Sequence, residues 1–151
     1  MTVMTAHPPG QAMARQHTPQ FNQLISAMPP ACFEQWFDTL ERVPMALGQA
    51  LYEPGQPLRH AYFPTTAVVS LYYTTASGAS AEFTSVGREG MIGMPLFMGG
   101  DTTSSSAVVQ SSGHGYRLPR AALVHAFEAE GPFRSLLLRY SQAVIDRKSV
   151  V

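Results

Sequence analysis

The chain has 151 residues, with ten basic and ten acidic side chains, so its formal net charge is zero. This length suits a single domain with its own core, and the balanced charge gives no indication of a nucleic-acid partner. The one cysteine, Cys32, excludes an internal disulfide and favours a reducing compartment.

The first nineteen residues are rich in Pro, Gln, Thr and Ala and show no apolar periodicity. Such a composition is typical of a disordered tail, which we place at residues 1–19. The next segment has apolar side chains at spacings of three and four, the period of a helix: Phe33, Trp36, Phe37 and Leu40. Pro30 suits the first turn of that helix, and we expect its apolar stripe to pack on a sheet.

From Val43 to about Leu118 the pattern changes to short apolar or alternating runs separated by turn clusters. The runs are MALGQALY, HAYFP, AVVSLYYTT, AEFTSVG, MIGMPLFM and SAVVQSSGHGYRL. The turns contain Pro-Gly, Ser-Gly and Gly-Gly pairs. Many short strands at this spacing predict an antiparallel sandwich, roll or barrel.

A helical period returns after Pro119, in PRAALVHAFEAEG and GPFRSLLLRYSQAVIDRK. Gly131 suits the end of the first helix and Pro132 the first turn of the second. The second helix carries an apolar stripe at spacings of three and four: Phe133, Leu136, Leu137, Tyr140 and Val144. Such a stripe either packs on the predicted sheet or pairs with a second copy of the chain.

The segment GREGMIGMPLFMGGDTTSSSAVVQ, residues 87–110, combines five glycines with a row of hydroxyl side chains. Glycine serves turns that need a positive φ as well as close approach to a phosphate, so the glycines alone do not identify a binding site. We interpret Gly87, Gly90, Gly99 and Gly100 as turn residues. For Gly93, beside the Thr/Ser row, both a turn and an effector pocket stay open.

The order of a helix, a roll of short strands, a short helix and a long apolar-striped helix resembles the sensor domain of Crp/Fnr transcription regulators, in the cyclic-nucleotide-binding-domain superfamily. LYEPGQPLRHAYFPTTAVVSLYY is similar to the family's first strands with their Pro-Gly turn, and GREGMIGMPLFMGG to its pocket-forming segment. The resemblance covers about Asn22 to Ile145. It implies a mainly β fold with flanking helices: an antiparallel β-roll (double-stranded β-helix or jelly roll) that ends in a dimerisation helix.

In family members that bind cyclic nucleotides, a Gly-Glu pair opens a short helix that faces the phosphate, and an Arg before Ser/Thr-Ala neutralises it. Carried onto this chain, the ligand-binding residues are Met91, Ile92, Gly93, Met94, Thr103, Ser104, Ser105, Ser106 and Ala107. Met94 stands in place of the Glu, and no Arg occurs in the Thr/Ser row. Because both charged partners are missing, we expect cyclic AMP and cyclic GMP to bind weakly or not at all. The pocket suits a neutral or apolar effector, or none, and we expect no cofactor.

The resemblance also implies a homodimer through the last helix, in which the five stripe residues Phe133, Leu136, Leu137, Tyr140 and Val144 form the interface. In the family a helix-turn-helix domain that binds DNA follows, but this sequence stops at DRKSVV. We expect a tail at 1–19, a β-roll with its short helices at 20–131, and a truncated dimerisation helix at 132–151. This chain alone should bind no specific DNA.

We expect a cytoplasmic protein with no membrane partner. No apolar run reaches the about 18 residues that span a bilayer, and the N-terminus lacks the pattern of a signal peptide.

Two other functions stay open: an interaction module whose β-roll binds no ligand, and a cupin-like metal enzyme. Cupins hold their metal with clustered histidines and a carboxylate. Here His60, His114 and His125 lie far apart in the sequence and form no His-x-His pair. No Gly-x-Ser-x-Gly nucleophile motif occurs. We therefore expect a sensor rather than an enzyme, and no metal site.

Overall fold

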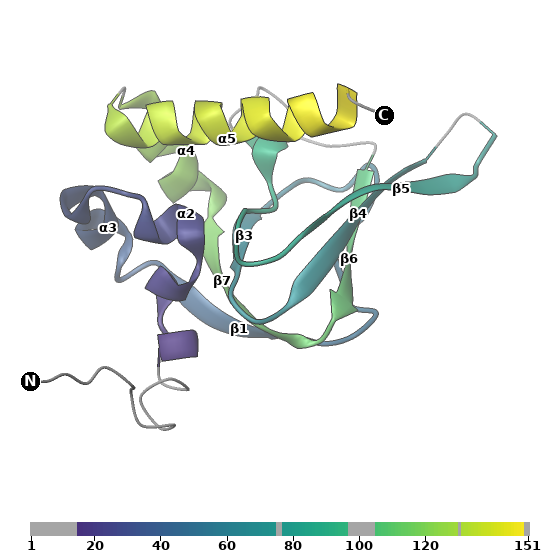
Figure 1. Ribbon diagram of the computed structural model, residues 1–151, viewed down its shortest axis with the longest axis horizontal. Helices are drawn as coiled ribbons and strands as arrows, with labels where there is room; N and C mark the ends of the chain where they lie inside the picture. Colours follow the sequence, from purple (N-terminus) through teal and green to yellow (C-terminus); the bar gives the residue numbers. More distant parts are fainter. Residues whose placement is uncertain (1–14, 75–76, 97–104, 130, 150–151) are drawn as a thin grey trace, which may run out of the picture.

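The computed structural model describes residues 15–149 apart from 75–76, 97–104 and 130. Two antiparallel sheets form a β-roll, and helices lie beside it (Figure 1). The described strands are β1 (Glu41–Met45), β2 (Ala50–Tyr52), β3 (His60–Pro64), β4 (Val68–Thr74), β5 (Ser80–Val86), β6 (Ser105–Ser111) and β7 (Gly113–Pro119). One sheet has the order β1-β7-β3 and the other β2-β6-β4-β5. The predicted antiparallel β-roll with flanking helices is confirmed.

Strand alternation decides which side chains of β3 enter the core. Ala61 and Phe63 are buried, while His60 and Tyr62 point to the opposite face and are half-buried. On that opposite face Tyr62 lies directly across from Arg117 of β7. One strand therefore contributes to the core on one face and to a polar surface on the other.

Two of the helices begin at the prolines that the sequence predicts as their first residues. The helical elements are η1 (Pro19–Phe21), α2 (Gln23–Ser26), α3 (Pro30–Trp36), η2 (Met94–Leu96), α4 (Arg120–Glu128) and α5 (Pro132–Ser149). Pro30 and Pro132 begin their helices as predicted, since the first turn does not need the N–H that proline lacks. The predicted stripe of α3 is wrong at its end: the helix stops at Trp36, and Phe37 is 61% exposed.

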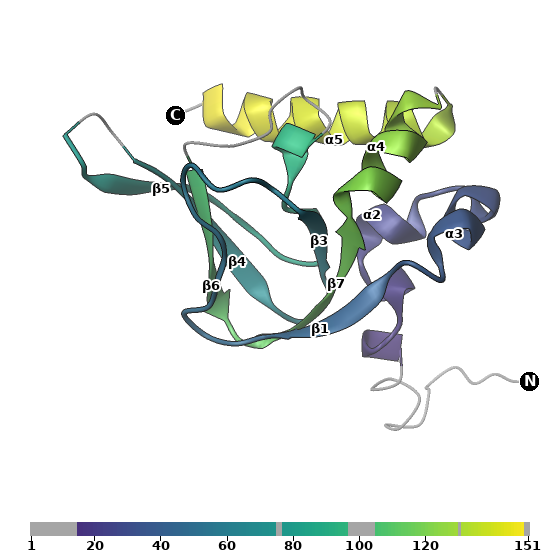
Figure 2. The same cartoon turned by 180° about the vertical axis from the view of Figure 1, so that it is seen from behind.

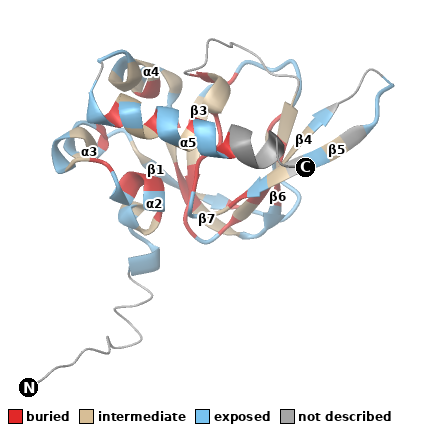
Figure 3. Ribbon diagram, turned by 45° about the horizontal axis from the view of Figure 1, so that its top comes forward, coloured by how far each residue is buried: buried red, intermediate tan, exposed pale blue. Residues whose placement is uncertain are grey.

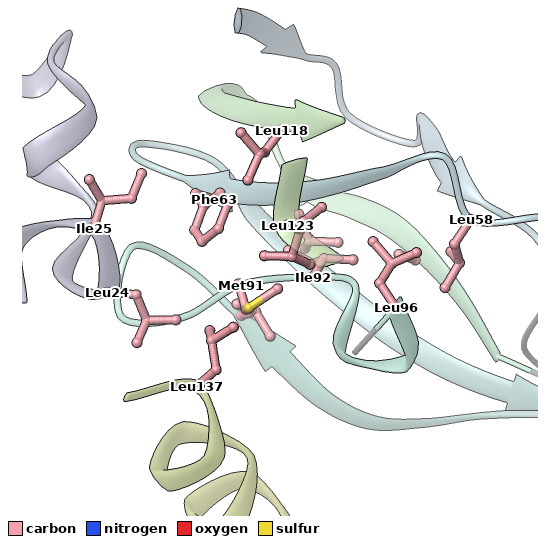
Figure 4. Packing of buried hydrophobic residues seen from close by; sticks show 14 of the residues in the cluster. Leu24, Ile25, Leu58, Phe63, Met91, Ile92, Leu96, Leu118, Leu123 and Leu137 are labelled. Carbon is pink, nitrogen blue, oxygen red and sulfur yellow. The ribbon is translucent and has the colours of Figure 1, made fainter. Parts of the chain in front are cut away.

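The core joins both ends of the chain to the roll. Figure 2, the opposite view, shows α2 and α3 at the end of the roll away from the β4–β5 hairpin. The Trp36 ring of α3 stands edge-on to the Phe133 ring of α5, with centroids 4.5 Å apart, and also packs on Phe63. Leu137 of α5 lies next to Met91 in the same core cluster (Figure 4). The long helix is thus part of the same core as the sheets.

The run MIGMPLFM forms no regular strand in its described part, residues 91–96. Ile92 makes a single bridge to Tyr62 of β3, and the chain then turns into η2. Proline explains the change, because Pro95 has no N–H to continue a ladder. The run SAVVQSSGHGYRL forms two strands, β6 and β7, which are separated just before Gly113.

Residues 1–14, most of the predicted tail, lie outside the described residues. Within 15–19, His17 contacts the roll: its carbonyl accepts a hydrogen bond from Tyr116, and its ring contacts Arg42. Over the described ranges, no helix combines the length and the apolar character needed to cross a membrane.

Candidate functional site

A cavity of about 120 Å³ lies between the segment 91–95, the sheet β2-β6-β4-β5 and α5. Its lining consists of apolar and hydroxyl side chains and one glycine: Tyr52, Leu71, Val86, Met91, Gly93, Met94, Pro95, Ser105, Tyr140 and Val144. None of these lining residues is charged. We call this cavity the effector cavity, since it lies at the segment that the sequence assigns to a ligand.

Backbone hydrogen bonds to β3 hold the floor of the effector cavity. The Ile92 N–H donates to the Tyr62 carbonyl at 2.8 Å, and the Tyr62 N–H donates to the Ile92 carbonyl at 2.9 Å. The next residue, Gly93, has a φ of +120°, and a Cβ there would lie 3.2 Å from the Ala61 Cα. Both the conformation and the close approach require glycine.

Tyr140 of α5 closes the cavity from the other side. Its hydroxyl accepts a hydrogen bond from the Met91 N–H at 3.1 Å and lies 3.3 Å from the Met91 carbonyl, to which it donates. Gly90 makes room for this contact, because a Cβ at that position would overlap the Tyr140 hydroxyl. The long helix is therefore hydrogen-bonded to the backbone of the cavity floor.

Asn22 holds the same segment from the N-terminal side. The side chain is fully buried and donates through Nδ2 to the carbonyls of Pro64 and Gly90, at 2.8 and 2.9 Å. Its Oδ1 accepts from the N–H groups of Leu24 and Ile25 and so caps α2. One amide thus joins α2, β3 and the turn before the cavity.

The polar groups of the effector cavity are hydroxyls. The Tyr52 hydroxyl lies 3.3 Å from the Ser105 Oγ. Burial raises the pKa of Tyr52 above its ordinary value, while the hydrogen bond with Ser105 lowers it by less. Tyr52 therefore stays protonated at neutral pH, and the cavity offers hydrogen bonds without a charge.

The structure brings together part of the expected ligand-binding set. Met91, Gly93, Met94 and Ser105 line the cavity. Other expected members do not: Ile92 and Ala107 lie in the core, and Ser106 on β6 pairs with Tyr72 of β4. Thr103 and Ser104 lie outside the described residues.

Sequence reasoning missed four lining residues, Tyr52, Leu71, Val86 and Pro95, and it assigned Tyr140 and Val144 to a dimer interface. The alternating patterns of β2, β4 and β5 mark inward side chains, but a single sequence does not tell which of them surround a cavity. Tyr52, Leu71 and Val86 come from strands that are separated in the chain and adjacent only through the β2-β6-β4-β5 order.

The apolar stripe of α5 faces the roll in this chain (Figure 3). Phe133, Leu137 and Val144 are 4%, 0% and 4% exposed. Leu136 and Tyr140 are half-buried and pack against the core. In contrast, Leu138 on the outer face is 47% exposed. The arrangement is the first of the two that the periodicity allowed, with the stripe packed on the sheets.

The described residues contain no group of three or more His, Cys, Asp or Glu side chains able to hold a metal ion. His60 lies on β3 and His114 on β7. Burial lowers the pKa of both histidines, with further lowering by Arg117 for His60 and by Arg42 for His114. Both are therefore neutral at physiological pH.

Comparison with known proteins identifies the family. A family model described as the cyclic nucleotide-binding domain matches residues 42–130. The structure is similar to the sensor domain of the transcriptional regulator DNR from Pseudomonas aeruginosa (TM-score 0.68, 16% identity, covering 95% of this chain and 97% of that one). It is also similar to the N-terminal domain of a transcriptional regulator from Streptomyces coelicolor A3(2) (TM-score 0.60, 18% identity, 89% and 91% covered).

A third similar structure is the regulatory subunit of a cAMP-independent protein kinase A from Trypanosoma cruzi, bound to guanosine (TM-score 0.70, 19% identity). That match covers 91% of this chain and 53% of the kinase subunit, so the chain spans about half its length. Comparison with curated protein sequences found no match. The chain belongs to the cyclic nucleotide-binding domain family, with the fold of the sensor domains of Crp/Fnr-type regulators.

Proposed function

We propose that this chain is the effector-sensing domain of a transcriptional regulator, that it binds a small uncharged molecule in the effector cavity, and that it does not bind cyclic AMP or cyclic GMP. One observation carries the proposal. The cavity lies at Gly93 and Ser105, where the resemblance puts a cyclic nucleotide, yet the described residues of its lining offer hydroxyls and apolar groups without a charge.

Cyclic nucleotides need partners that this site lacks. Residues 97–106 contain no arginine to pair with a phosphate, and Met94 replaces the acidic residue that would hold a ribose. Backbone donors are scarce too: Pro95 has no N–H, and the Leu96 N–H donates to the Gly93 carbonyl at 3.0 Å. A hydrogen bond to a charged group contributes about 1.5–3 kcal/mol, so losing two costs about two orders of magnitude in affinity or more.

The size of the cavity limits the effector. Pockets for drug-sized ligands have about 300–1,000 Å³, whereas an apolar cavity of about 150 Å³ holds benzene. The effector cavity, at about 120 Å³, suits a molecule near the size of one aromatic ring. The similar kinase subunit bound to guanosine supports an uncharged ligand in this fold. Ser105 and Tyr52 would give such a molecule a hydroxyl partner.

The test is an NMR titration of the full chain with phenol and with indole. We expect saturable amide shifts at residues 91–94 and 105, which line the cavity. The matched variants are Ser105→Leu and Ser106→Leu, because neighbouring side chains on a strand point to opposite faces. Ser105→Leu should abolish the shifts by filling the cavity, and Ser106→Leu should leave them unchanged. If neither probe binds, the interaction module without an effector is the better interpretation. If both variants lose binding equally, the probe does not bind in the effector cavity, which contradicts the proposal.

We also propose that the chain forms a homodimer through α5. The proposal is supported by the resemblance and by Leu138, a large apolar side chain 47% exposed on the outer face of that helix. The stripe residue Leu137 is unsuitable for a test, because a charge there would disrupt the core. Leu138 is the residue of choice.

Light scattering at tens of micromolar should give the mass of a dimer for the unmodified chain and of a monomer for Leu138→Glu. Leu47→Glu is the matched control, since Leu47 is also an exposed leucine but lies between β1 and β2. It should leave the dimer intact. A monomeric unmodified chain, or a dimer unaffected by Leu138→Glu, would contradict an interface on this face.

A further inference from the structure

A second cavity, of about 360 Å³, opens where the end of β2 and the residues before β3 meet β3 and β7. Its lining mixes basic, aromatic and aliphatic side chains: Leu51, Tyr52, Gln56, Pro57, Leu58, Arg59, His60, Tyr62 and Arg117. It is three times as large as the effector cavity, and Tyr52 is the only residue common to both linings. We call it the basic cavity.

Strand pairing brings its polar groups together. Arg117 of β7 lies directly opposite Glu41 of β1 on one side and Tyr62 of β3 on the other, so the three side chains stand in a row on one face. The Arg117 Nε donates to the Glu41 Oε1 at 2.7 Å, and the Tyr62 hydroxyl also interacts with this guanidinium. A guanidinium has five N–H donors, so these contacts leave donors for a further partner.

Arg59 supplies a second positive charge. Its guanidinium makes no hydrogen bond or ion pair with any residue that the structure describes. Arg59 and Arg117 both act on His60, whose pKa is lowered mainly by burial and then by Arg117. With two arginines, one carboxylate and a neutral histidine, the basic cavity carries a net positive charge.

The basic cavity also offers apolar contact. Leu58 is buried in its wall, Leu51 is half-buried, and the rings of Tyr52 and Tyr62 border it. A solvated arginine on an open surface would lack such a wall. The combination suits a molecule with an anionic group at one end and an apolar body at the other.

We propose that the basic cavity is a second ligand site, which binds a small organic anion with a carboxylate or phosphate group held by Arg59 and Arg117. A guanidinium presents its donors in a planar fork that matches the oxygens of either group. The site is separate from the effector cavity and does not depend on the function proposed for it. The effector cavity, on one side of Tyr52, would take uncharged ligands, and the basic cavity, on the other side, would take anions.

The test is an NMR titration of the full chain with phenyl phosphate, benzoate and inorganic phosphate, at constant ionic strength, with benzyl alcohol as the uncharged control. We expect saturable shifts of the amides of residues 58–62 and 117 with both organic anions. Inorganic phosphate should bind more weakly, because it makes no contact with the apolar wall. Benzyl alcohol should not shift these amides.

Three charge variants give the sharpest readout. Arg59→Gln should weaken phenyl phosphate about tenfold or more, because it removes a charged donor, and it should fold normally because this side chain is exposed and unpaired among the described residues. Glu41→Gln should strengthen binding several-fold by removing the carboxylate that competes for Arg117. Arg139→Gln changes the net charge as Arg59→Gln does, on an exposed site of α5, and should have no effect.

The site would be supported if Arg59→Gln lowers the affinity for phenyl phosphate, Glu41→Gln raises it and Arg139→Gln leaves it unchanged. Equal weakening by Arg59→Gln and Arg139→Gln would show non-specific attraction of anions and overturn the proposal. It would also be overturned if no organic anion gave saturable shifts at these amides up to tens of millimolar.

Discussion

The effector cavity and the basic cavity share one described wall residue, Tyr52, and differ in size and in the charge of their linings. The effector cavity is small, lies under α5 and is lined by uncharged side chains. The basic cavity is larger, lies beside the neighbouring strands β3 and β7 and is lined by two arginines. Among the described residues, the positive charge that a cyclic nucleotide would require lies in the basic cavity and not in the cavity beside Gly93.

The fold determines where the cavities form, and the alternation of side chains along each strand determines which residues line them. Arg117 and Leu118 are neighbours on β7, yet Leu118 is fully buried in the core and Arg117 lies in the basic cavity. A family assignment alone therefore does not identify the ligand.

Removing the anchor of α5 should have the largest effect, because the helix roofs the effector cavity. Leu137→Ala should lower the free energy of unfolding by about 2–5 kcal/mol, since Leu137 is completely buried. Leu47→Ala, the same change at a leucine that is 72% exposed and lies outside α5, should cost under about 1 kcal/mol. Urea unfolding measures both, and equal losses would mean that α5 does not pack on the roll as described.

Tyr140→Phe should lower the free energy of unfolding by about 1–3 kcal/mol, because the Met91 N–H loses its partner in a partly buried place. The same variant should weaken the binding of phenol, since the cavity floor is no longer held. Tyr72→Phe is the control: that hydroxyl makes no hydrogen bond with the described residues. If the two variants behave alike, the contact with Met91 does not stabilise the site.

The pKa of His60 should respond to the charges of the basic cavity. Burial, Arg117 and Arg59 lower the pKa of His60 below the ordinary value of 6.5, and Glu41 raises it. Arg59→Gln should therefore raise this pKa, and Glu41→Gln should lower it further. NMR titration of the imidazole protons measures both shifts. If neither substitution changes the pKa of His60, then Arg59 and Glu41 do not lie close enough to His60 to act on it.

The same shift predicts a small dependence of stability on pH. The unfolded chain has the ordinary histidine pKa of 6.5, so between that value and the lower folded pKa it binds more protons than the folded chain. The free energy of unfolding should thus fall as the pH drops through this window and level off below it. In His60→Gln this part of the decrease should disappear in urea unfolding at a series of pH values.

Much of the fold could be predicted from the sequence because its signals are local. The period changes near Val43 and Pro119, and the prolines at positions 30 and 132 start helices where expected. The exceptions have local causes too. Pro95 prevents the run MIGMPLFM from forming a regular strand. Helix α3 ends at Trp36, so Phe37 stays exposed and does not join the core.

The site was harder to predict because its residues are distant in the sequence. Gly93 and Ser105 were identified through the resemblance, whereas Tyr52 and Leu71 line the cavity only because β2, β6 and β4 are neighbours. Periodicity also showed that α5 has an apolar face without showing what covers it. No local motif links Arg59 to Arg117, which the pairing of β3 with β7 brings to one cavity.

The most direct test of the central claim, that the effector cavity is built for an uncharged ligand, is calorimetric titration of the full chain with cyclic AMP at physiological salt. We expect no saturable heat at micromolar concentrations, because none of the described residues that line the cavity is charged. Saturable micromolar binding, lost in Ser105→Leu and kept in Arg59→Gln, would place the nucleotide in the effector cavity and contradict the account.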